Sequence, residues 1–192
     1  VYPGCTPAPT MSTSRDDYVI AATRWDIDRN LGFLLDALSG MEDLSLHLML
    51  VGNWPSGKFL SDVQALIRDT SLRDRVSIVR DPSEDELERL YSRARGFVLP
   101  SDAVFGMGAL EAAAHGTPIV MTRTSGAWEV FEPGKDGLAY EENNGETLKD
   151  ALMRLEDVDE VIRLGTSAWE KAQHYSWEAH CRSLLQTLGL RT

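Results

Sequence analysis

Short apolar runs alternate with longer segments of helical period along nearly the whole chain, and this alternation limits the possible folds most strongly. It is typical of βα units, in which crossover helices join parallel strands. Strands are expected at Tyr18–Ala22, Leu46–Val51, Val76–Val79, Gly96–Leu99, Pro118–Thr122 and Gly137–Tyr140. Helices are expected at Leu31–Leu38, Lys58–Asp69, Glu84–Ala94, Met107–His115, Ala127–Phe131, Glu146–Leu155, Val158–Gln173 and Trp177–Leu188. The sequence predicts an α/β fold with a doubly wound, six-stranded, parallel Rossmann-like sheet and a C-terminal helical tail.

Composition excludes several classes of protein. The chain has 192 residues, of which 43% are hydrophobic and 26% charged, as in a folded globular domain. A net charge of −11 argues against a nucleic-acid binder. Two distant cysteines, Cys5 and Cys181, make neither a disulfide framework nor a zinc site. We expect a cytoplasmic protein, and for the full-length parent a possible association with the inner face of a membrane.

The first residues differ in composition from the rest. Cys5–Arg15 is rich in Thr, Ser and Pro and indicates a linker or an unpaired arm. We therefore assign residues 1–16 to a connection with a missing N-terminal domain, and residues 17–192 to the folded domain.

Ligands of open parallel sheets collect outside the carboxyl ends of the strands, so the loops that follow the strands are the place to look for a site. After the fourth expected strand, the run Gly106-Met107-Gly108-Ala109 leads directly into a helix. Glycines let a ligand approach the backbone, and the first helical N–H groups favour a phosphate. Glu111, one turn into that helix, can accept hydrogen bonds from a ribose diol. The alternative is a tight turn that carries an exposed glutamate.

Arginines follow the first and third expected strands. Arg24 and Arg29 lie five residues apart in one loop and can clamp a diphosphate, or they can simply be solvated. Arg80 follows the third strand. Trp54 and Trp128, in two other loops, either pack against a base or sugar or belong to the core. We include Arg80 and Trp54 among the expected donor contacts.

The ordered set of motifs resembles the donor-binding half of retaining glycosyltransferases of the two-domain GT-B architecture, family 4 type. The motifs are TRWDIDRN, LVGN, DELERLYSRARGFVLPS, FGMGALEAAAHGTPIV and SGAWEVFEPGKDGLAY, with VYPG and YSWEAH near the ends. The resemblance implies a UDP-, GDP- or ADP-sugar donor, transfer of a hexose to a glycan, lipid or small molecule, no required metal, and an acceptor domain elsewhere in the parent chain. Without that domain, this chain alone is expected to be inactive.

The resemblance also implies roles for single residues. Arg24, Arg29 and the amides near Met107 and Gly108 hold the diphosphate, and Glu111, the second carboxylate of a two-Glu motif, holds the ribose. The first glutamate of that motif is expected at position 103, where this sequence has Ala103, and Asp102 can take the place of the missing glutamate only through a register shift. Glu129 stands where the family often has an acidic residue facing the donor.

Three other interpretations stay open. A non-catalytic nucleotide-binding or regulatory lobe is favoured by Ala103. An NADP-dependent oxidoreductase fits Gly106-Met107-Gly108 and Arg123, although Glu111 replaces the third glycine of the dinucleotide motif. Asp26-Ile27-Asp28 has the form of a metal–diphosphate motif, but Asp28 or Asn30 is better explained as a helix N-cap. His115 is expected at a helix C-terminus rather than as a base.

Overall fold

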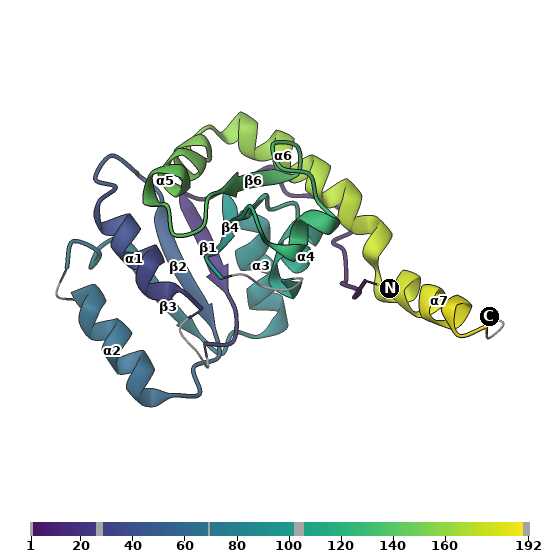
Figure 1. The fold of residues 1–192 in the computed structure, drawn as a ribbon, viewed down its shortest axis with the longest axis horizontal. Helices are drawn as coiled ribbons and strands as arrows, with labels where there is room; N and C mark the ends of the chain where they lie inside the picture. The colour runs from purple at the N-terminus through teal and green to yellow at the C-terminus, as the bar shows by residue number, and fades with distance from the viewer. Residues whose placement is uncertain (1, 26–28, 69, 102–105, 190–192) are drawn as a thin grey trace.

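The computed structural model describes residues 2–25, 29–68, 70–101 and 106–189, which form an α/β domain around one parallel sheet (Figure 1). The six strands are β1 (Tyr18–Ala22), β2 (His47–Gly52), β3 (Val76–Arg80), β4 (Gly96–Leu99), β5 (Ile119–Thr122) and β6 (Gly137–Tyr140). Their order is β3-β2-β1-β4-β5-β6, and every neighbouring pair is parallel. The predicted doubly wound sheet is confirmed, with its switch point between β1 and β4.

The α-helices follow the predicted pattern, with ends that shift by at most one residue. They are α1 (Leu31–Ser39), α2 (Gly57–Arg68), α3 (Glu84–Arg93), α4 (Met107–Ala114), α5 (Gly145–Arg154), α6 (Val158–Ala172), α7 (Trp177–Thr187) and the short 3-10 helices η1 (Gly126–Glu129) and η2 (Gln173–Tyr175). One prediction is corrected, because the α-helix expected at Ala127–Phe131 is the 3-10 helix η1. Its four residues make little more than one turn, a length typical of 3-10 structure.

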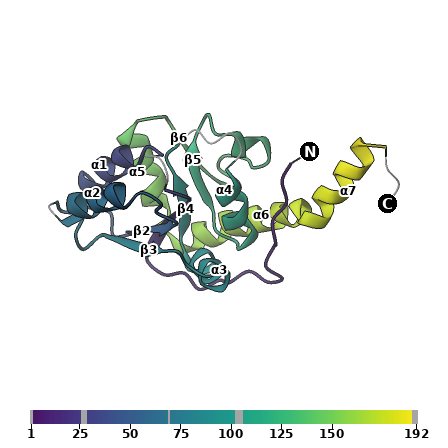
Figure 2. The same cartoon turned by 90° about the horizontal axis from the view of Figure 1, so that it is seen from below.

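Helices cover both faces of the sheet (Figure 2). Alternate β1 residues point to opposite sides: Val19 packs in the core under α1, α2 and α5, whereas Ile20 packs in the core under α3 and α4. Helix α6 contributes to both cores, through Leu164 on one side and Ala168 on the other. Beyond it, α7 projects from the body, has no buried residue and leaves Trp177 51% exposed (Figure 1).

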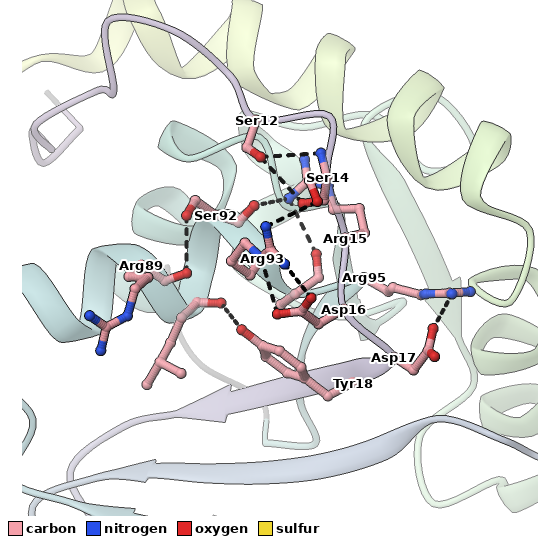
Figure 3. A network of polar contacts seen from close by, with 12 residues as sticks. Ser12, Ser14, Arg15, Asp16, Asp17, Tyr18, Arg89, Ser92, Arg93 and Arg95 are labelled. Carbon is pink, nitrogen blue, oxygen red and sulfur yellow. Dashed lines mark hydrogen bonds and ion pairs between the residues drawn. The ribbon is translucent and has the colours of Figure 1, made fainter.

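The segment before β1 is attached to the body of the domain. Cys5 forms an isolated parallel bridge with Ser176, and the Ala8 amide donates to the Ala114 carbonyl at 3.0 Å. Near β1 the Arg15 guanidinium donates to backbone carbonyls at the ends of α3 and α4, and Asp16 pairs with Arg93 (Figure 3). The segment is therefore no unpaired arm, because these bonds hold it across the helices. Its role as a connection to another domain stays a prediction.

Within the described part of the chain, no helix combines the length and the apolar character that a membrane span requires.

Candidate functional site

The first turn of α4 lies directly against the carboxyl end of β1. Its N-cap, Gly106, has the left-handed φ of 73°, which a residue with a Cβ adopts only with strain. A Cβ added to Gly108 would come within 3.2 Å of the Ala22 carbonyl oxygen and 2.9 Å of the Phe97 ring. Glycine at position 108 thus permits the close approach of α4 to β1 and β4. The N-terminus of α4 therefore opens at the switch point of the sheet.

The predicted contacts with the diphosphate at this turn involve Met107, Gly108 and Ala109, which differ in their surroundings. The Ala109 amide donates to the Gly106 carbonyl at 2.9 Å, and the Ala109 side chain is fully buried. This amide is engaged inside the helix, and the contact of Ala109 with the donor stays a prediction. Met107 and Gly108 are half-buried at the start of the helix. The backbone amides of these two residues, in the first turn of α4, remain the predicted contacts for an anion.

A cavity of about 440 Å³ lies at the carboxyl ends of β1, β2 and β3, beside α3 and α4. Arg24 and Glu111, which are 87 positions apart in the sequence, both line it. Its other lining residues are Ala22, Thr23, Val51, Gly52, Asn53, Asp81, Pro82, Leu87 and Tyr91. The fold thus brings the predicted phosphate-binding arginine and the predicted ribose-binding carboxylate into one hollow.

Glu111 has a partner that the sequence did not reveal. The buried Tyr91 hydroxyl on α3 donates to Glu111 Oε2 at 3.3 Å. Burial, with the nearby Glu111 carboxylate, raises the Tyr91 pKa well above its ordinary value, so the phenol keeps its proton and acts as a donor. The helical period of α3 predicts a buried tyrosine, but only the packing of α3 on α4 aims it at Glu111.

The same carboxylate borders a second cavity of about 260 Å³, under the N-terminal segment. Cys5 lines this cavity, and burial together with Glu111 raises the pKa of its thiol to about 11. His115, also in the lining, is the C-cap of α4, and its Nδ1 lies 2.9 Å from the Glu111 carbonyl oxygen. The expected place of His115 at a helix C-terminus is confirmed.

The second predicted arginine lies nearer to β4. Arg29 is half-buried and has the left-handed φ of 52°, immediately before α1. Its neighbour Asn30 is the N-cap of α1, as expected, but its side chain does not cap the helix. The Asn30 amide instead donates to the Pro100 carbonyl at 3.1 Å, which ties the start of α1 to the end of β4. Arg29 therefore stands beside the switch point, although it does not line the 440 Å³ cavity.

Trp54, whose contact with the donor stays a prediction, lies in the core. Its ring is 4% exposed, stacks on Trp25 with 5.2 Å between ring centroids, and also contacts Phe59. Because other aromatic rings cover it, Trp54 packs in the core. Arg80 is exposed at the end of β3 and is absent from the cavity lining, so its contact with a donor stays a prediction.

Several predictions fall outside the described residues, namely those for Asp26-Ile27-Asp28, Asp102 and Ala103. Among the residues that are described, no cluster of three or more His, Cys, Asp or Glu side chains could hold a metal ion. Glu129 is exposed on η1, and the Trp128 indole donates to the Thr122 carbonyl at 2.8 Å.

Solved structures that share this fold include glycosyltransferases. A sucrose-phosphate synthase from Thermosynechococcus elongatus superposes with a TM-score of 0.78 and 28% identity, over 90% of this chain and 46% of that one. HepE from Anabaena, solved with UDP-glucose, has a TM-score of 0.78 and 20% identity, over 91% and 49% of the two chains. The sheet and its helices match the C-terminal domains of GT-B glycosyltransferases.

Sequence comparison gives the same family. The D-inositol 3-phosphate glycosyltransferase of Corynebacterium urealyticum is 31% identical over 149 residues, which are 75% of this chain and 35% of that protein. This chain thus spans about a third of the length of that relative. The family model "Glycosyl transferases group 1" matches residues 9–168. The chain therefore belongs to the group 1 glycosyltransferases.

Proposed function

We propose that this chain is the donor-binding lobe of a retaining glycosyltransferase that moves a hexose from a nucleotide-diphospho-sugar to an acceptor. One observation carries the proposal: in a chain of this family, Arg24 and Glu111 line the same 440 Å³ cavity at the strand ends. An arginine and a carboxylate in one cavity suit a nucleoside diphosphate, because the arginine can bind the diphosphate and the carboxylate can bind the ribose. HepE, which shares the fold, was solved with UDP-glucose, and this supports a donor of the same class.

The diphosphate lies across the switch point in this proposal. Arg24 and Arg29 face it from the loop after β1, and the amides of Met107 and Gly108 face it from the start of α4. When the nucleoside diphosphate leaves, negative charge grows on the phosphate oxygens, and these groups stabilise it as it develops. Loss of one such donor typically raises a barrier by about 2.7–4 kcal/mol. The lobe needs no nucleophile of its own, and the mechanism needs no metal.

The ribose lies at Glu111. An ionised carboxylate only accepts hydrogen bonds, so its two oxygens suit the two hydroxyls of a ribose. The Tyr91 hydroxyl holds one of these oxygens at 3.3 Å and so restricts the rotation of the carboxylate. Tyr91 is therefore a positioning residue in this proposal.

Transfer requires an acceptor domain in the parent protein, so the isolated chain should bind a donor without turning it over. A non-catalytic nucleotide-binding lobe is the second candidate, and Ala103 in place of the first family carboxylate favours it. Family membership argues against the oxidoreductase alternative.

Calorimetry with UDP, GDP and ADP tests the proposal. At least one should bind, and Arg24→Ala should weaken it about tenfold or more while leaving the affinity for the matching nucleoside nearly unchanged. Glu111→Gln should weaken the nucleoside diphosphate clearly more than its 2′-deoxy analogue, which keeps only the 3′-hydroxyl contact with the carboxylate. The controls are Arg182→Ala and Glu178→Gln on the projecting helix α7, where the two residues pair on the surface.

Absence of binding by all three ligands would refute the proposal. If Arg24→Ala lowers the affinities for the nucleoside diphosphate and for the nucleoside equally, Arg24 does not bind the phosphates. Turnover distinguishes the two candidates: a full-length parent that binds nucleotide yet forms no product would favour the non-catalytic lobe.

A further inference from the structure

A pair of polar side chains closes one side of the 440 Å³ cavity and is not used by the phosphate and ribose contacts. Asn53 follows β2, Asp81 follows β3, and both line the cavity. Asn53 Nδ2 donates to Asp81 Oδ1 at 2.6 Å. Both residues are exposed and line the cavity, so their remaining polar atoms can form hydrogen bonds with a ligand bound there.

The backbone fixes this corner. The Asn53 carbonyl accepts from the Trp25 amide at 2.8 Å, and the Asp81 amide donates to the Gly52 carbonyl at 3.0 Å. Asp81 has the left-handed φ of 46°, and Ser83, two residues later, caps α3 by accepting from the Glu86 amide. The Asn53–Asp81 pair therefore sits on a rigid base, which favours selective recognition.

The hydrogen bond also determines which polar atoms the pair presents. A carboxylate only accepts, so the Asn53 amide must turn its NH₂ group toward Asp81. The free oxygen of Asp81 and the carbonyl oxygen of Asn53 are then both acceptors. The corner presents a surface that is rich in acceptors and carries a negative charge.

The place of this corner along the sheet suits the base of a bound nucleotide. The diphosphate is proposed at β1 and β4, and the ribose at Glu111. Because the ribose joins the phosphates to the base, the base continues away from the switch point, toward β2 and β3, where Asn53 and Asp81 lie. Pro82 and Leu87 line the same cavity and give it apolar surface for a planar ring.

We infer that the Asn53–Asp81 pair selects guanine, so that the donor is a guanosine diphosphate sugar; the inference rests on the proposed function. Guanine offers two adjacent donors, N1–H and the N2 amine, which match a carboxylate. Uracil offers one donor flanked by two carbonyl oxygens, which a carboxylate repels. Adenine places a ring acceptor beside its amine. A bidentate contact of this kind discriminates by about 1–3 kcal/mol, which is roughly 5- to 150-fold.

Calorimetry with GDP, IDP, UDP and ADP tests the inference, because inosine differs from guanosine only by the missing N2 amine. GDP should bind at least about fivefold more tightly than UDP or ADP, with IDP between them. Asp81→Asn should weaken GDP about tenfold or more and reduce the ratio of GDP to IDP affinity toward one. Asp62→Asn, on the exposed face of α2, is the matched control and should change neither value.

The outcomes separate this inference from the proposed function. If UDP or ADP binds as tightly as GDP, or if Asp81→Asn leaves the GDP to IDP ratio unchanged, the guanine assignment is overturned. If the guanine assignment fails but Arg24→Ala still weakens the binding of every nucleoside diphosphate, the proposed donor site is still supported. Absence of binding by all four ligands overturns both. Thermal melts of Asp81→Asn exclude loss of folding as the cause.

Discussion

Arg15 joins the ends of two helices that carry site residues, and its loss should measurably destabilise the domain. Its Nη1 donates to the carbonyls of Ser92 at 2.7 Å and Ala94 at 3.3 Å, at the end of α3 (Figure 3). Its Nη2 donates to the Gly116 carbonyl, just after α4. The last carbonyls of a helix have no partner within the helix and carry partial negative charge, so a cation suits them.

The magnitude follows from these three bonds. A hydrogen bond to a charged group contributes about 1.5–3 kcal/mol, and a favourable charge at a helix C-terminus adds about 0.3–1 kcal/mol. The contributions do not add fully, because the three bonds share one guanidinium and because burial, which lowers the Arg15 pKa to about 10, offsets part of their gain. We expect Arg15→Ala to lower the free energy of unfolding by about 2–4 kcal/mol.

Urea unfolding of the whole chain, followed by circular dichroism, measures this change. Arg15→Lys keeps the charge but cannot span three carbonyls with a planar fork, so it should recover only part of the loss. Arg182→Ala, which removes an exposed pair on α7, should cost less than about 0.5 kcal/mol. A loss for Arg15→Ala no larger than that of the control would refute the reasoning.

Two further predictions concern groups around Glu111. Tyr91→Phe removes the 3.3 Å bond to the carboxylate and should weaken a ribonucleoside diphosphate about three- to tenfold by calorimetry, with a smaller effect on the 2′-deoxy analogue. An equal effect on both analogues would contradict the positioning role. At pH 8, iodoacetamide should alkylate the exposed Cys181 and spare Cys5, which is 3% exposed and has a pKa of about 11. Because the folded pKa of Cys5 lies above its ordinary value of 9.0, this thiol should stabilise the fold below pH 9, and its contribution should fall as the pH rises toward 11, which thermal melts can follow. Alkylation of both thiols in the native state would disprove the burial argument.

The elements of the fold could be predicted from the sequence because their causes are local. The strands at Tyr18–Ala22, Gly96–Leu99 and Gly137–Tyr140 have their predicted ends, since apolar runs are bounded there by polar residues, Gly or Pro. The position of Glu111 one turn into α4 follows from helical spacing alone. Arg24 and Glu111 could also be assigned to one edge of the sheet, because parallel strands present all their carboxyl ends there.

The contacts between distant segments were decided only by the tertiary structure. Trp54 was a candidate for either the core or the donor site, and its stacking on Trp25 places it in the core. The bond from Tyr91 to Glu111 crosses from α3 to α4, and the Asn53–Asp81 pair joins two loops. The hydrophobic period of each element specifies which face is buried, but it carries no information about which side chain of another element meets that face. That pairing depends on the packing of all elements together, and so does the chemistry of the site.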